Sequence, residues 1–307
     1  MRLRPRRFPG SLPVPLRGAE GMKLYRDFAT TEEIDAEYNV LGNVADPDAI
    51  IRGWVERGAA ATARLDCRLG VPYGPTLAEH NDIFPAGEGA PLHVFIHGGY
   101  WRRFSARDHV FLAPALVEAG LCAVFVNYEL CPTVSMDEIV RQVRAAIAWA
   151  YRHGAEFGAD RGRLTISGHS AGGHLVAMAL QTDWPGVYGL PADVIKGAVA
   201  ISGLFDLGFV PYSYVQPKVQ ASWDQVRRLS PIDHLPDSAP PLLVAVGNAE
   251  TGEFRRQSRD FLAAWRAKGL RGSWLEPVGK HHLTVLEELE DPSSALHRAL
   301  VATAKAA

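Results

Sequence analysis

Ser170 lies in the segment Gly168-His169-Ser170-Ala171-Gly172, which is a G-x-S-x-G pattern. An apolar run over residues 164–167 precedes the pattern and a helical run follows it, which predicts a strand, a tight turn and a helix. Such a turn pushes the serine Oγ clear of the sheet, and the first N–H groups of the helix point at developing negative charge. The pattern therefore favours a nucleophilic serine over the alternative, a glycine-rich loop that holds an inert one.

A second motif, His97-Gly98-Gly99-Tyr100-Trp101, directly follows another apolar run. A glycine loop at this place presents backbone N–H groups to the oxyanion of an acyl-transfer reaction. Loss of one such donor costs about 3 kcal/mol. We predict that the oxyanion donors are the N–H groups of Gly99, Tyr100 and Ala171, and that His97 orders the loop rather than acting as a base.

A nucleophilic serine needs a histidine base, and the base needs an orienting carboxylate. In strand–turn–helix sites of this kind the chain order is serine, acid, histidine. His281 and His282 follow the last expected strand, so both are candidate bases. The candidate acids are Glu250, Glu253 and Asp206. Glu250 is favoured because it lies in the loop after a strand, whereas Glu253 begins a helix and Asp206 suits a loop cap.

Strand-like and helix-like runs alternate over most of the chain. The predicted strands are residues 63–69, 92–97, 122–128, 163–167, 197–202, 242–246 and 272–277, and the predicted helices are 108–119, 136–153, 171–181 and 253–268. Continuous apolar runs suit strands that are buried on both faces. The alternation predicts an α/β fold whose central sheet is mostly parallel, with helices on both faces.

Two segments depart from this alternation. Residues 208–230 are rich in aromatic residues and prolines, and we predict a small cap insertion over the site; the alternative is a surface excursion. Residues 1–21 are rich in arginine and proline, which predicts a disordered extension, with translation starting at Met1 or Met22. Residues 22–307 would then form one domain.

Composition narrows the class of protein. Of 307 residues, 47% are hydrophobic and 21% charged, and the net charge is −2, so no nucleic-acid partner is expected. No run is long and apolar enough for a membrane span, and a cytoplasmic protein is expected. Three cysteines without paired spacing predict neither disulfides nor a zinc site. The sequence leaves open whether the chain is a monomer or a homodimer.

These motifs together resemble the kynurenine formamidase (arylformamidase) branch of the α/β-hydrolases. The resemblance runs from about Tyr25 to Leu289 and includes Asn127-Tyr128-Glu129-Leu130-Cys131-Pro132, Ile201-Ser202-Gly203-Leu204-Phe205-Asp206-Leu207, Leu229-Ser230-Pro231 and Glu253-Phe254-Arg255-Arg256-Gln257-Ser258. It implies the α/β-hydrolase fold, with Glu250 as the acid and His282 rather than His281 as the base. The family's acid is usually Asp, and the same motifs occur in bacterial esterases.

The resemblance implies a serine hydrolase that cleaves a small aryl formamide or carboxylic ester through an acyl-enzyme on Ser170. It implies neither a metal nor an organic cofactor. The expected substrate-binding residues are Tyr100, Trp101, Tyr212 and Tyr214. The alternatives are a general carboxylesterase of the same fold and, more remotely, a non-catalytic member that binds a ligand.

Overall fold

The computed structural model describes residues 23–307, so the expected extension over residues 1–21 lies outside the described residues. One eight-stranded sheet has the order β1-β2-β4-β3-β5-β6-β7-β8. The strands are β1 (Arg68–Pro72), β2 (His80–Phe84), β3 (Ala90–Ile96), β4 (Cys122–Val126), β5 (Ala159–His169), β6 (Gly197–Ile201), β7 (Leu242–Ala245) and β8 (Gly272–Leu275). From β4 through β3, β5, β6 and β7 to β8, each strand is parallel to its neighbour in the sheet. Strand β2 pairs antiparallel with both β1 and β4. The prediction of a mostly parallel sheet is confirmed.

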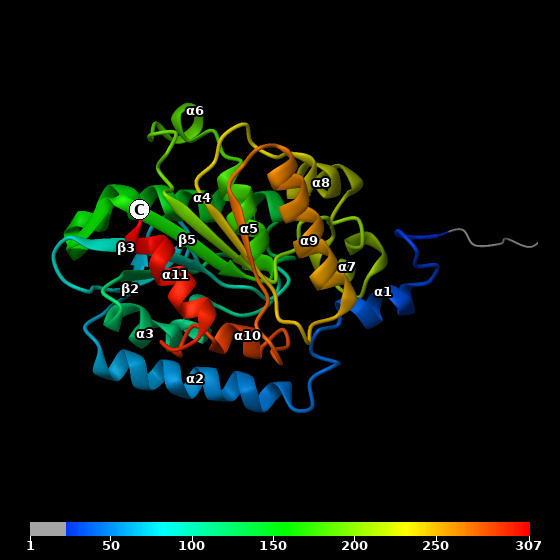
Figure 1. The fold of residues 1–307 in the computed structure, drawn as a ribbon, viewed down its shortest axis with the longest axis horizontal. Helices are drawn as coiled ribbons and strands as arrows, with labels where there is room; N and C mark the ends of the chain where they lie inside the picture. The colour runs from blue at the N-terminus through cyan, green and yellow to red at the C-terminus, as the bar shows by residue number, and fades with distance from the viewer. Residues whose placement is uncertain (1–22) are drawn as a thin grey trace, which may run out of the picture.

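Helices cover both faces of this sheet (Figure 1). They are α1 (Thr31–Tyr38), α2 (Pro47–Arg64), α3 (Ala113–Glu118), α4 (Met136–His153), α5 (Ala171–Leu180), α6 (Trp184–Tyr188), α7 (Gln216–Val219), α8 (Trp223–Arg228), α9 (Gly252–Ala267), α10 (Thr284–Glu287) and α11 (Ala295–Lys305). The core is divided accordingly: Val94 and Ile96 of β3 pack with α4, α5 and α9, whereas Phe95 packs with α3 and α11. This alternation follows from the two-residue period of a strand.

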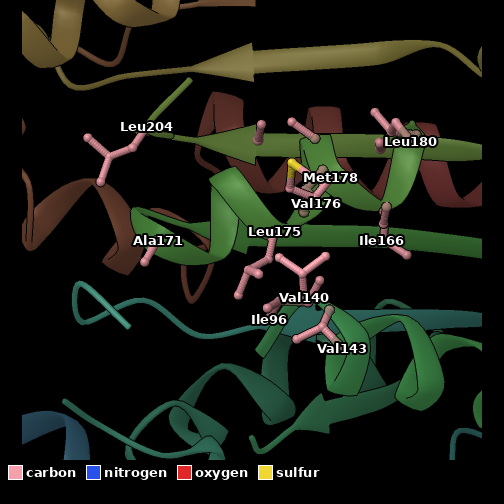
Figure 2. Packing of buried hydrophobic residues seen from close by; sticks show 14 of the residues in the cluster. Ile96, Val140, Val143, Ile166, Ala171, Leu175, Val176, Met178, Leu180 and Leu204 are labelled. Atoms are coloured by element: carbon pink, nitrogen blue, oxygen red, sulfur yellow. The ribbon is translucent and has the colours of Figure 1, made fainter. Parts of the chain in front are cut away.

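Helix α5 lies in the middle of the first core layer. All ten of its residues are buried. Leu175 and Val176 lie among Ile96 and Ile166 of the sheet and Val140 of α4 (Figure 2). A helix that is apolar all round is typical of a buried position. Ser170, the residue just before α5, is therefore attached to a helix that is buried along its whole length.

The N-terminal part of the sheet differs from the expectation. The predicted strand over residues 63–69 is wrong for residues 63–67, because Ala63 and Arg64 end α2, residues 65–67 lie in no strand, and β1 begins at Arg68. Asp46 caps α2 and the alanine-rich stretch extends it, because alanine has the highest helix propensity. Strand β2 was not predicted, because Asn81 and Asp82 look like loop residues although both are fully buried.

Four fully buried histidines make stability depend on pH. Burial lowers the pKa of His93 and His97 to about 3 and that of His109 and His174 to about 4. An unfolded histidine has a pKa of about 6.5. The unfolded chain therefore takes up protons below pH 6.5 that the folded chain does not bind, so this contribution to stability is full above pH 6.5 and falls as the pH drops.

We expect the free energy of unfolding to fall steeply between about pH 5.5 and 4. Each proton bound only by the unfolded state contributes about 1.4 kcal/mol per pH unit, so four give about 5 kcal/mol per pH unit. Urea titrations at a series of pH values measure this slope. A free energy of unfolding that stays level from pH 7 to 4.5 would contradict the burial of neutral histidines.

Candidate active site

Ser170 occupies the turn between β5 and α5 in a strained backbone conformation. Its φ is 58° and its ψ is −121°, a region that non-glycine residues seldom adopt. The Ser170 N–H donates to the carbonyl oxygen of Ile201 in the neighbouring strand β6 at 2.8 Å, which holds the turn. A Cβ at Gly172 would overlap the carbonyl oxygen of Ile96. Strain of this kind is typical of functional sites, where it fixes a reactive side chain.

Glu250 and His282 form a buried hydrogen-bonded pair at the same edge of the sheet. The Nδ1 atom of His282 lies 2.6 Å from Oε2 of Glu250. The other carboxylate oxygen, Oε1, accepts hydrogen bonds from Ser202 Oγ at 2.5 Å and from the Gly247 N–H at 2.8 Å. The carboxylate is therefore held on both oxygens and orients the histidine ring, with Nδ1 as the protonated nitrogen.

The rival residues are engaged elsewhere. Asp206 accepts hydrogen bonds from Tyr25 OH and from the Gly208 N–H, as a loop cap does. Glu253 accepts from Tyr38 OH and pairs with Arg256. The backbone of His281 instead starts the turn into α10, where its N–H donates to Thr284 Oγ1 at 3.0 Å. Of the candidate acids, Glu250 is the one in contact with His282.

The loop after β3 lies directly against the turn that holds Ser170. A Cβ at Gly98 would lie 2.6 Å from the carbonyl oxygen of His169 and 2.9 Å from Ser170 Cβ, so only glycine fits there. Tyr100 and Trp101 follow with positive φ values of 51° and 56°. Their side chains stabilise this conformation: Tyr100 OH donates to the Tyr38 carbonyl oxygen at 2.6 Å, and Trp101 Nε1 donates to His174 Nδ1 at 3.2 Å.

Ala171 is the first residue of α5, so its N–H has no acceptor within the helix. It follows Ser170 directly, and Gly98 of the loop after β3 packs against Ser170. This arrangement can hold backbone donors around a carbonyl oxygen that is bound at Ser170.

Ser170 and His282 open into one cavity that contains about 650 Å³ of space, counting its mouth. It is lined by Asn39, Val40, Leu41, Trp54, Gly98, Gly99, Tyr100, Arg102, Arg103, Phe104, His109, His169, Ser170, Tyr214, His282 and Leu283. No hydrogen bond joins Ser170 Oγ to His282 among residues 23–307, and in unliganded sites this contact often forms only when substrate binds.

The structure separates the four expected substrate-binding residues into two pairs. Tyr100 and Tyr214 line the cavity, but Trp101 and Tyr212 do not. Trp101 is fully buried because its indole is turned towards His174, and Tyr212 packs on Trp223 at a ring-centroid distance of 5.6 Å. For Trp101 and Tyr212 the expectation therefore differs from the structure.

Part of the cavity wall comes from segments that are far apart in sequence. The segment 208–230 holds α7 and α8 and contributes Tyr214, whose N–H donates to Asp35 of α1 at 2.7 Å. Phe209 stacks on Tyr38 with ring centroids 3.6 Å apart. Asn39, Val40 and Leu41 follow α1 and also line the cavity. No sequence motif predicted this N-terminal contribution, although the Thr30–Glu33 capping box marks α1.

The sheet order, with a strained serine after its central strand, defines the chain as an α/β-hydrolase. A family model described as BD-FAE matches residues 83–184. The chain is 31% identical over 259 residues to a kynurenine formamidase of Danio rerio, covering 82% of this chain and 85% of that protein. It is 33% identical to a kynurenine formamidase of Salmo salar, covering 76% and 79%. The chain belongs to the kynurenine formamidase family.

Solved structures agree on the fold. A protein of Silicibacter sp. TM1040, whose description proposes a thioesterase, is 31% identical with a TM-score of 0.77, covering 89% of this chain and 99% of that one. An esterase of Pyrobaculum calidifontis shares the fold at 19% identity and a TM-score of 0.68, covering 84% and 91%. The chain is thus a hydrolase of the arylformamidase or esterase type. In residues 23–307 no helix is long and apolar enough to cross a membrane.

Proposed function

We propose that Ser170, His282 and Glu250 are the catalytic triad of an enzyme that hydrolyses small aryl formamides. The observation that carries the proposal is the buried Glu250–His282 pair, which faces the same cavity as the strained Ser170. A serine, a base and an orienting carboxylate are the parts that acyl transfer needs, and they stand here in the expected chain order.

The reaction proceeds in two steps. His282 Nε2 takes the Ser170 proton as Oγ attacks the formyl carbon, and the N–H groups of Gly99, Tyr100 and Ala171 stabilise the oxyanion. The C–N bond then breaks, and the arylamine leaves with the proton from His282. Water, deprotonated by His282, attacks the formyl-serine ester and releases formate. Glu250 keeps the proton of the neutral ring on Nδ1 and stabilises the ring's cation.

The walls of the cavity support an aromatic substrate. Four aromatic side chains line it: Trp54, Tyr100, Phe104 and Tyr214. Aromatic rings favour offset or edge-to-face contact with another ring. Two similar proteins are named kynurenine formamidases, which supports a formamide as the scissile group.

A general carboxylesterase is the second candidate. Esterase LipQ of Mycobacterium tuberculosis is 28% identical over 69% of this chain, and the chain covers 56% of it. That likeness supports ester hydrolysis by the same triad. We also propose a cytoplasmic location, supported by Cys67, Cys122 and Cys131, which are free thiols in the described structure.

A substrate panel tests the choice between the two candidates. We expect kcat/KM for N-formylkynurenine and simple aryl formamides to exceed that for 4-nitrophenyl octanoate at least about 100-fold, because an enzyme built for formyl transfer should bind the transition state of a long acyl chain less well. The Ser170→Ala protein corrects for contaminating esterases. Equal or faster turnover of the octanoate would instead establish a general carboxylesterase.

A further inference from the structure

The charged residues of the cavity lining are all cationic. Arg102 and Arg103 line the cavity, and within residues 23–307 the lining contains no Asp, Glu or Lys. His109 and His169 also line it, and burial lowers the pKa of both, to about 4 for His109, so neither is charged at neutral pH. The two guanidinium groups therefore set the charge of the cavity wall.

Neither guanidinium has an anionic partner. Among residues 23–307 no carboxylate lies within 4.0 Å of Arg102 or Arg103. Arg107, a few residues further along, instead pairs with the buried Asp82 at 2.9 Å. The Nε atom of Arg102 is buried without a hydrogen-bond partner. A buried N–H without an acceptor costs about 1–3 kcal/mol, so an acceptor supplied by a ligand would be stabilising.

Local contacts hold these side chains at the wall of the cavity that Ser170 and His282 also line. The Arg102 guanidinium carbon lies 5.1 Å from the centre of the Tyr214 ring, and that of Arg103 lies 5.3 Å from the centre of the Phe104 ring. Both arginines follow the Gly98–Tyr100 loop, and the Arg102 N–H closes a turn onto the Gly99 carbonyl oxygen at 3.1 Å. The same loop thus presents backbone N–H groups near Ser170 and two cations along the cavity wall.

From these contacts we infer that Arg102 and Arg103 bind a carboxylate on the substrate and make the enzyme selective for anionic aryl substrates. Guanidinium groups match the two oxygens of a carboxylate. Arg102 is partly buried, which strengthens its attraction for an anion, whereas Arg103 is exposed and adds a second positive charge at the cavity. The inference rests on the proposed function for the scissile group. Because a formyl group has no place for a carboxylate, the anion belongs to the arylamine part of the substrate.

Direct binding tests the inference without requiring turnover. Isothermal titration calorimetry compares 4-phenylbutyrate with 4-phenylbutyramide, which has the same shape but no charge. We expect the wild-type protein to bind the carboxylate at least about tenfold more tightly than the amide, as hydrogen bonds to charged groups usually give. In the Arg102→Gln/Arg103→Gln double variant the preference should fall to within about threefold, and Arg102→Lys should keep part of it.

Arg161→Gln is the matched control, because it removes one positive charge from the exposed start of β5, at the other end of the strand from Ser170. This variant should keep the wild-type preference. Equal binding of the two ligands by the wild-type protein, or of neither, would overturn the inference, and so would a preference that survives in the double variant.

Kinetics separate this inference from the proposed function. Two pairs of substrates are compared. The first pair is an aryl formamide that carries a carboxylate and the methyl ester of that carboxylate. The second pair is an aryl acetate that carries a carboxylate and the corresponding methyl ester. The inference predicts that the double variant lowers the anionic-to-neutral ratio of kcat/KM about tenfold or more, mainly through KM. If the arginines instead stabilised the oxyanion, both members would slow equally and the ratio would not change. If the enzyme hydrolysed the acetates but not the formamides, and the double variant still lowered the anionic-to-neutral ratio, the proposed formamide substrate would be rejected. The inferred carboxylate site would still be supported.

Discussion

Ser170→Ala is expected to lower kcat/KM for aryl formamides and esters roughly 10⁴- to 10⁶-fold, as loss of a triad nucleophile does in serine hydrolases. In the proposed mechanism the serine Oγ forms the acyl-enzyme, and an alanine methyl group cannot replace it. The hydrogen bond that holds the turn comes from the Ser170 backbone N–H, and alanine keeps this N–H. The protein should therefore remain folded. The measurement is steady-state kinetics, with circular dichroism to check the fold.

Ser258→Ala is a matched control for this substitution. Ser258 is fully buried in α9 and its Oγ has no hydrogen-bond partner among the described residues. Removal of an unpaired buried hydroxyl should not destabilise the protein, and activity should stay within about twofold, because surface and core changes away from a site rarely alter it. Ser170→Ala activity within tenfold of the wild type would show that another residue is the nucleophile.

Glu250→Gln is expected to lower kcat about 10³- to 10⁴-fold. Ser202 and the Gly247 N–H both donate to Oε1, so the glutamine carbonyl oxygen should take that position. Its amide NH₂ then faces His282 Nδ1, which must become an acceptor. The ring proton moves to Nε2, on the side where the base must accept the Ser170 proton. The defect should therefore lie in kcat, with a smaller change in KM.

Asp206→Asn controls for loss of a carboxylate. Asp206 is the other acid that follows a strand at this edge, but it bonds to Tyr25 and the Gly208 N–H. We expect its kcat to change less than about tenfold, with most of the effect on stability. If Asp206→Asn were as inactive as Glu250→Gln, the assignment of Glu250 as the acid of the triad would be contradicted.

Local sequence pattern was sufficient for the central part of the fold. Strands β3, β4 and β7 are continuous apolar runs, and the helix 136–153 was predicted with the bounds of α4 because its apolar stripe and its Ser135 cap agree. Strand β2 is not an apolar run and was therefore not predicted. Its Asp82 is buried but paired with Arg107 from another segment, and a contact 25 residues away leaves no local pattern.

Some residues of the candidate site could likewise be predicted from local sequence, and others could not. The turn at Ser170 and the loop at Gly98 carry glycines that close packing requires, so a motif marks them. Ser202 has no such motif, and its contact with Glu250 depends on two loops that meet only in the folded chain. Trp54 and Leu41 likewise reach the cavity through packing of the N-terminal helices. Motifs record local constraints, whereas cavity walls are set by tertiary contacts.

The most direct test of the central claim is trapping of the acyl-enzyme. The protein is mixed with 4-nitrophenyl acetate and quenched within the first turnover, and its peptides are analysed by mass spectrometry. We expect an acetyl group on the peptide that contains Ser170 and, when deacylation limits turnover, a burst of one 4-nitrophenolate per active site, both absent from Ser170→Ala. An acetyl group on another residue, with Ser170 unmodified, would contradict nucleophilic catalysis by Ser170.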